Sequence, residues 1–265
     1  MDLSNAKYIL PNMFTLASVF TGFYSILITL RATSPEELQT AAWLIAISLI
    51  FDAFDGRVAR ATKTQSAFGT QLDSLADAIA FGVAPAVLVY RWGLEPLGTL
   101  GVFFAFVFTA CGIMRLARFN VIASSEEGPS RYFLGLPIPP AAATLISVVL
   151  AHTSLTGDMH ANAPWAVVML LVPLALLMVS NARYRTFKKV KLRGPAGIAV
   201  ALLLIIAVVV SVQFKPSVAF AGLSSVYVVL GITESILGLR GRLSGRLRRA
   251  RAISGDEVVE ELDED

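Results

Sequence analysis

Cysteine, histidine and charged residues are all scarce in this chain of 265 residues. The single cysteine, Cys111, excludes an internal disulfide framework. The two histidines, His152 and His160, flank Asp158 at a spacing that matches no established metal-ligand pattern. Asp, Glu, Lys and Arg make up only 15% of the residues, against roughly 25% in soluble domains. The shortage of charge excludes an ordinary soluble enzyme.

Apolar residues supply 55% of the chain, and the mean hydropathy is +0.69. Apolar runs of about twenty residues, enough to cross a hydrocarbon core of about 30 Å, recur along the chain. We therefore predict an all-α integral membrane protein of about eight transmembrane helices. The runs begin near Ile9, Leu38, Gln71, Leu97, Leu136, Pro164, Ala196 and Val218.

The segments between the apolar runs are too short to form a separate soluble core. We therefore predict one membrane domain over residues 1–240 and a tail, first basic and then acidic, over 241–265. No small-residue cleavage site follows the first run, so we expect no cleaved signal peptide. The basic part of the tail is suited either to anionic headgroups or to solvent.

Basic residues gather in alternate loops. With eight spans, 19 of the 22 Lys and Arg residues fall on the side of the two termini, and only Arg31, Arg91 and Lys215 fall opposite. By the positive-inside rule, we expect the termini on the cytoplasmic side of a cell's inner membrane.

Four aspartates stand at the ends of two neighbouring apolar runs. The segment reads Asp52-x-x-Asp55-Gly56-x-x-Ala59-Arg60, eight residues, then Gly69-x-x-x-Asp73-x-x-x-Asp77. Residues three or four apart share one helix face, so each aspartate pair lines one stripe of its helix. The short connection makes the two helices antiparallel neighbours. We therefore expect all four carboxylates to converge near the cytoplasmic surface.

An unpaired carboxylate inside a membrane costs roughly 2.5 to 3.5 kcal/mol on the insertion scale, and four together repel one another. Two divalent cations would cancel this charge. Carboxylate oxygens suit Mg²⁺ or Mn²⁺, with Ca²⁺ as an alternative. A carboxylate-held metal pair is a recurring device for phosphoryl transfer. Gly56, Ala59 and Gly69 leave room either for a ligand or for close helix packing, and the guanidinium of Arg60 suits phosphate.

The complete pattern resembles the signature of the CDP-alcohol phosphotransferases, and every signature position is matched. Four flanking segments are similar to those of membrane-type phosphatidylserine synthases: Leu10-Pro11-Asn12, QLDSLADAIAFGVAPAVLVY (71–90), CGIMRLARFNV (111–121) and FLGLPIPPAA (133–142). The resemblance covers about the first 150 residues. One departure stands at 18–22, where Ser-Val-Phe-Thr-Gly replaces the Asn-Leu-Phe-Cys-Gly common in serine synthases.

The resemblance implies a helical-bundle enzyme, commonly a homodimer, that transfers the phosphatidyl group of CDP-diacylglycerol to L-serine and releases CMP. It also implies that Asp52 and Asp73 bridge two metals, Asp55 binds one, and Asp77 binds the other and accepts the proton of the acceptor hydroxyl. It assigns contacts with the CDP-lipid to Asn12, Thr15, Gly56, Ala59, Arg60, Ser66 and Gly69. Thr15 and Ser66 have a backbone-capping role as an alternative.

Three polar residues end the fourth apolar run: Arg115, Arg118 and Asn120. Two guanidiniums and an amide suit the carboxylate of free serine, although membrane anchoring by snorkelling is an alternative. Rival acceptors are glycerol 3-phosphate and inositol phosphate. A cation-coupled transporter is a distant alternative, because intramembrane carboxylates also mark ion pathways. The partners expected are the bilayer and the two substrates, and no nucleic acid.

Overall fold

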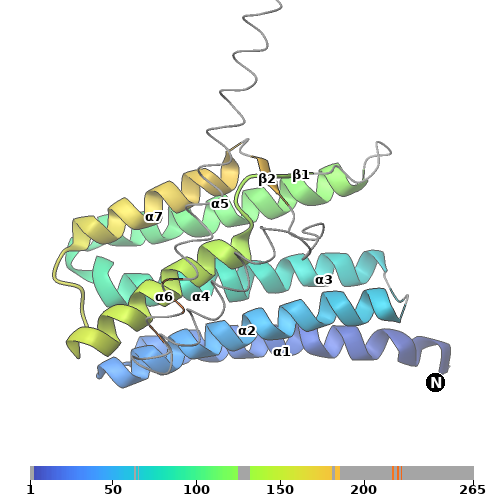
Figure 1. Cartoon of the computed structure of the whole chain (residues 1–265), viewed down its shortest axis with the longest axis horizontal. Coiled ribbons are helices and arrows are strands. Elements are labelled where there is room, and N and C mark those ends of the chain that lie inside the picture. Colours follow the sequence, from blue (N-terminus) through green and yellow to red (C-terminus); the bar gives the residue numbers. More distant parts are fainter. Residues whose placement is uncertain are drawn as a thin grey trace, which may run out of the picture.

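The computed structural model describes residues 3–62, 64, 66–124, 132–180, 183–185, 217, 220 and 222. Its helices run side by side, with the connections at the two ends of the bundle (Figure 1). The main helices are α1 (Leu3–Arg31), α2 (Pro35–Ala61), α3 (Ala67–Asp77), α4 (Ala84–Val89), α5 (Thr99–Ser124), α6 (Ile138–Thr156) and α7 (Pro164–Val179). Two π-helical segments and one 3-10 turn continue α3 and α4 as η1 (Ala78–Val83), η2 (Tyr90–Leu94) and η3 (Glu95–Leu97).

Among the described residues, five helical stretches are long and apolar enough to cross a membrane, and α7 is a shorter apolar helix of 16 residues. The protein is therefore a multi-pass membrane protein. Six of the predicted runs coincide with these helices. The runs predicted from Ala196 and Val218 lie outside the described residues except for positions 220 and 222, so the total of eight stays a prediction.

Two details stand out from a simple bundle of straight helices. The polar stretch at residues 91–96, before the run that begins near Leu97, is helical, and the turn ends at Gly98, whose φ of 54° suits glycine. A short antiparallel pair, β1 (Tyr132–Leu134) with β2 (Arg183–Arg185), stands beside the otherwise helical bundle.

Local sequence explains where the helices of the site begin. α2 starts with a capping box, in which Ser34 Oγ accepts from the Glu37 amide at 3.4 Å and Glu37 Oε2 accepts from the Ser34 amide at 3.3 Å. Pro35 at the first turn has no amide hydrogen to satisfy. At α3, Ser66 Oγ accepts from the Gly69 amide at 3.0 Å. α2 ends at Ala61 and the capped α3 begins at Ala67, so a short connection joins the two helices.

The π-helical segment η1 follows Asp77 directly and packs against α1, α5 and α6. Phe81 of η1 is fully buried, together with Phe108 of α5 and Ile138 of α6. Segments of π-helix widen the helix locally and are frequent at functional sites. Here the segment lies at the boundary between the polar end of the third span and the apolar core.

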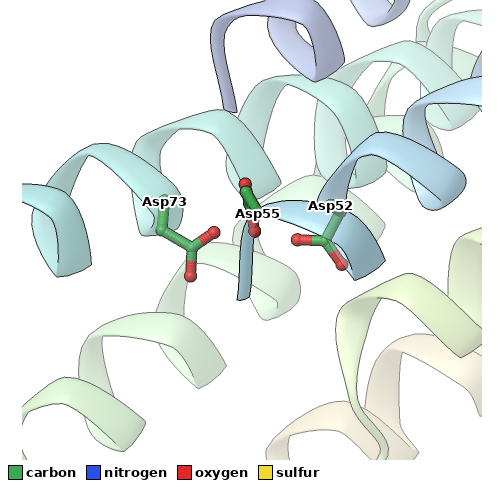
Figure 2. Close-up of side chains that lie close together, drawn as sticks. All are labelled: Asp52, Asp55 and Asp73. Carbon is green, nitrogen blue, oxygen red and sulfur yellow. The ribbon is translucent and has the colours of Figure 1, made fainter. Parts of the chain in front are cut away.

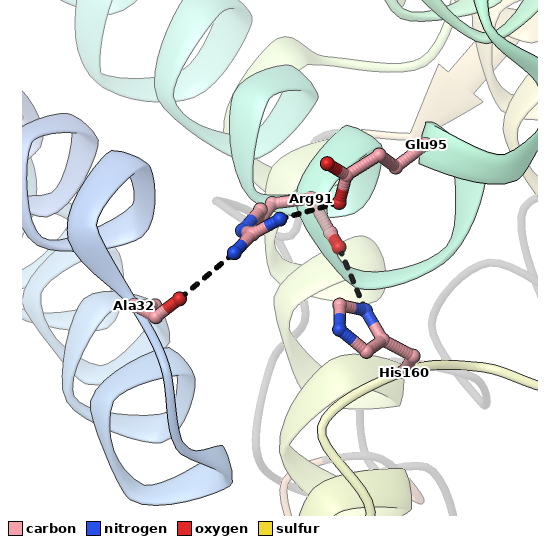
Figure 3. A network of polar contacts seen from close by, with 4 residues as sticks. All are labelled: Ala32, Arg91, Glu95 and His160. Atoms are coloured by element: carbon pink, nitrogen blue, oxygen red, sulfur yellow. Dashed lines mark hydrogen bonds and ion pairs between the residues drawn. The ribbon is translucent and has the colours of Figure 1, made fainter.

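At the opposite end of the bundle, Arg91 joins two helices (Figure 3). Its Nη2 donates to the carbonyl oxygen of Ala32 at 3.0 Å, and its Nη1 pairs with Glu95 at 2.5 Å. The two histidines are also engaged here: His160 Nδ1 contacts the Arg91 carbonyl at 3.2 Å, and His152 Nδ1 accepts from Trp92 Nε1 at 3.1 Å. The histidines therefore belong to this structural network, and the metal cluster of the described residues does not include them.

Candidate active site

Three of the four aspartates gather between α2 and α3. One carboxylate oxygen each from Asp52, Asp55 and Asp73 lies within 4.8 Å of the others. Figure 2 shows Asp55 between Asp52 of α2 and Asp73 of α3. Asp55 is 3% exposed and the other two are half-buried. The convergence predicted from helical spacing is confirmed for these three.

The three carboxylates fit a hard divalent cation. All the ligand atoms are oxygens, which is the donor set of Mg²⁺, Mn²⁺ and Ca²⁺. Three unit negative charges this close repel one another strongly where water is scarce. A cation held by Asp52, Asp55 and Asp73 would remove that repulsion.

Asp77 adjoins this cluster but is not one of the three gathered residues. Its carboxyl lies within hydrogen-bonding contact of Asp52 and close to Asp73, one turn earlier on α3. Asp77 is the last residue of α3, and the π-helical segment η1 starts at the next residue. The structure therefore distinguishes a cluster of three carboxylates from a fourth beside it.

Two arginines lie near the carboxylates from different sides. Arg115 of α5 is buried, lies close enough to Asp77 to interact electrostatically, and stacks over the Phe119 ring at 5.6 Å. Arg60 of α2 lies near Asp55 and folds back along its own helix. A Cβ at Gly56 would lie 3.5 Å from Arg60 Nη1, which is an ordinary van der Waals contact, so the guanidinium lies over Gly56. Each arginine brings a positive charge near one carboxylate, Arg60 near Asp55 and Arg115 near Asp77.

The residues predicted to contact the CDP-lipid fall into groups beside the cluster. Asn12 of α1 lies near the start of α3, where a Cβ on Gly69 would be 3.8 Å from Asn12 Oδ1 and 3.2 Å from Ser66 Oγ. The Ser66 hydroxyl caps α3, which is the structural alternative considered for it. Ala59 lies one turn after Asp55, and its carbonyl accepts from the Thr64 amide at 3.1 Å.

The described hydrogen bond of the Thr15 hydroxyl goes to a side chain and not to a helix backbone. Its Oγ1 donates to Asp55 Oδ2 at 2.8 Å, and both side chains are buried. The hydroxyl thus contacts a carboxylate of the cluster directly.

The three residues predicted to bind serine point in different directions around α5. Arg115 lies near enough to Asp77 to interact electrostatically, whereas Arg118 Nη1 donates to the Val179 carbonyl at the end of α7, at 3.3 Å. Asn120 Nδ2 donates to Ser74 Oγ at 2.9 Å. Arg115 and Arg118 stand three positions apart and share one helix face, whereas Asn120 lies about 140° around the helix from Arg115.

Sequence reasoning missed several hydroxyl contacts. Ser74 Oγ accepts from the Asn120 side-chain amide. Ser74 follows Asp73 directly in the sequence, and that position was the one signal that could have pointed to it. In the departure at 18–22, Thr21 Oγ1 contacts Ser48 Oγ at 2.6 Å and Ser18 Oγ donates to the Ser48 carbonyl at 3.2 Å. These hydroxyls join α1 to α2.

Residues 8–172 match the family model of the CDP-alcohol phosphatidyltransferases, and this stretch contains α2, α3 and the whole acidic cluster. The chain belongs to this family. The resemblance seen in the aspartate spacing is confirmed, and the protein is a transferase of the CDP-alcohol class.

Similar proteins within the family carry related names. The CDP-diacylglycerol–serine O-phosphatidyltransferase of Helicobacter pylori (strain ATCC 700392 / 26695) is 38% identical over 229 residues, covering 86% of this chain and 91% of the relative. The protein of the same name from Saccharomyces cerevisiae is 38% identical over 174 residues, covering 63% and 60%. The archaetidylserine synthase of Methanothermobacter thermautotrophicus is 33% identical over 177 residues, covering 66% and 69%.

Proposed function

We propose that this family member transfers the phosphatidyl group of CDP-diacylglycerol to L-serine, giving phosphatidylserine and CMP. The observation that carries the proposal is the acidic cluster with a buried arginine, Arg115, beside its fourth carboxylate, Asp77. The names of the relatives support serine as the acceptor. One name contains diacylglycerol and another contains archaetidyl, but both contain serine.

The metal requirement follows from the donor set. Two divalent cations, Mg²⁺ or Mn²⁺, held by Asp52, Asp55, Asp73 and Asp77 would neutralise the diphosphate and the leaving CMP. The cluster of three supports the first of these sites, and the contact between Asp77 and Asp52 supports a neighbouring one.

The side chains supply positioning and proton transfer. Asp77 takes the proton of the serine hydroxyl, which is a poor nucleophile at neutral pH. The hydroxyl oxygen then attacks the lipid-side phosphorus, and the bond from that phosphorus to the oxygen of CMP breaks. Arg115 holds the serine carboxylate, because a guanidinium can bind it with two hydrogen bonds. Its position beside Asp77 would place the hydroxyl next to its base.

The donor lipid occupies the other side of the cluster. Arg60 offers its guanidinium to the diphosphate beside Gly56, and Asn12 and Gly69 stand together nearby. We further propose a homodimer in the inner membrane with the site facing the cytoplasm, where soluble serine and the lipid-anchored nucleotide meet. The one-sided distribution of Lys and Arg supports this orientation.

A panel of acceptors tests the function. Purified protein receives CDP-diacylglycerol, Mn²⁺ or Mg²⁺, and equal concentrations of serine, glycerol 3-phosphate or inositol phosphate. We expect CMP release and labelled lipid with serine, and loss of both with EDTA. A preference for either phosphorylated alcohol would contradict the serine assignment. Cation flux into liposomes without CMP release would contradict the proposed transfer reaction.

A further inference from the structure

Thr15 and Asp55 form a buried hydrogen bond between two helices. Thr15 Oγ1 of α1 donates to Asp55 Oδ2 of α2 at 2.8 Å, and the two residues are 4% and 3% exposed. Hydrogen bonds to an ionised carboxylate are stronger than those between neutral groups. Because the bond is shielded from water, it restrains the orientation of the Asp55 carboxylate.

Asp55 needs such a restraint. One of its carboxylate oxygens lies within 4.8 Å of oxygens of both Asp52 and Asp73. Before a cation binds, like charges at this range push the side chains apart. The Thr15 hydroxyl holds Asp55 from the α1 side, so the carboxylate is already in place when a cation arrives.

We propose that Thr15 is a positioning residue that orients Asp55 for a divalent cation, in place of the CDP-lipid contact predicted from the sequence. The inference rests on the proposed metal-binding role of the cluster, and it does not depend on which alcohol is the acceptor. Partners that orient metal-binding side chains change metal affinity by about 10- to 100-fold when they are removed.

The chain offers a matched control on the same helix. Thr21 also lies on α1, and its hydroxyl contacts Ser48 Oγ of α2 at 2.6 Å. Thr21→Val therefore removes a similar bond between α1 and α2 without touching a carboxylate of the cluster. Thr15→Val removes the donor at nearly constant shape, and Thr15→Ser keeps a hydroxyl.

Mn²⁺ binding to the full-length protein in detergent, without substrates, tests the proposal. The paramagnetic resonance signal of free Mn²⁺ reports the affinity, and size-exclusion profiles check that each variant is folded. We expect Thr15→Val to weaken Mn²⁺ binding about tenfold, and Thr15→Ser and Thr21→Val to bind like the wild type. The KM for CDP-diacylglycerol at saturating Mn²⁺ stays at the wild-type value in Thr15→Val.

Two results would overturn the proposal. Unchanged Mn²⁺ affinity with a raised KM for CDP-diacylglycerol would make Thr15 a lipid contact. An equal loss of Mn²⁺ affinity in Thr21→Val would show that the Thr15–Asp55 bond acts only through the packing of α1 against α2. A wild-type protein that binds Mn²⁺ but makes no phosphatidylserine would contradict the proposed acceptor and leave the role of Thr15 standing.

Discussion

Gly22 of α1 and Ala80 of η1 meet backbone to backbone. A Cβ on Gly22 would lie 2.8 Å from the Cα of Ala80, closer than side chains approach. Such small-residue contacts let membrane helices pack tightly. Because η1 continues α3, this contact determines how the helix that carries Asp73 and Asp77 lies against α1.

Gly22→Val should disturb this packing. Overpacking of a closely packed contact costs about 1–3 kcal/mol, so we expect a lower thermal stability in detergent and reduced CMP release. Phe23→Val is the control, since Phe23 is 51% exposed on the same helix. If Gly22→Val were as stable and active as Phe23→Val, the close contact would have no role in the fold.

Asp77→Asn tests the proton acceptor. An amide keeps the shape of the side chain but cannot accept the serine proton, so we expect CMP release to fall by about 10²-fold or more. Asp158→Asn, in the exposed loop after α6, is the control. Full activity in Asp77→Asn would contradict the assignment of the base.

Asp73→Asn should separate stability from metal binding. Removing one of three close carboxylates lowers their repulsion, so the metal-free variant should be more heat-stable than the metal-free wild type. Mn²⁺ should raise the Tm of the wild type, because a ligand of the folded state stabilises it, and should raise that of the variant less. Differential scanning fluorimetry with and without EDTA measures both effects. Glu36→Gln, at the other end of α2, should leave the Mn²⁺ effect intact.

Arg115→Lys tests the serine contact. Lysine cannot hold a carboxylate with the planar pair of hydrogen bonds that arginine offers. We expect the KM for serine to rise about tenfold, which corresponds to about 1.4 kcal/mol, with little change in the KM for CDP-diacylglycerol. Arg118→Lys should change the serine KM less, because that guanidinium donates to the Val179 carbonyl. A larger rise of the serine KM in Arg118→Lys than in Arg115→Lys would assign the serine contact to Arg118 instead.

Arg91→Lys should weaken the fold without changing catalysis. Lysine cannot replace both the bond to Ala32 and the pair with Glu95, and hydrogen bonds of charged groups are worth about 1.5–3 kcal/mol. We expect a lower Tm and unchanged KM values, since this network lies at the end of the bundle away from the aspartates. Arg31→Lys, at an exposed residue of α1, should leave the Tm unchanged. A raised KM in Arg91→Lys would show that the two ends are coupled.

Much of the site could be predicted because helical periodicity is local. The spacing of Asp52, Asp55 and Asp73, with a short connection between their helices, was enough to bring their carboxylates together. The directions of Arg118 and Asn120 could not be predicted in the same way. Their partners, Val179 and Ser74, are more than 40 residues away in the chain and depend on how α7 and α3 pack.

The sequence by itself determined the membrane class, most of the helices and the chemistry of the aspartate segment. These depend on apolar run length, capping residues and spacing within single helices, which are properties of neighbouring residues. Only the tertiary structure decided that Asp77 stands beside the cluster of three, that Arg115 lies near Asp77, and that Thr15 donates a hydrogen bond to Asp55. Those relationships arise where separate helices meet, at distances and rotations that no single helix specifies.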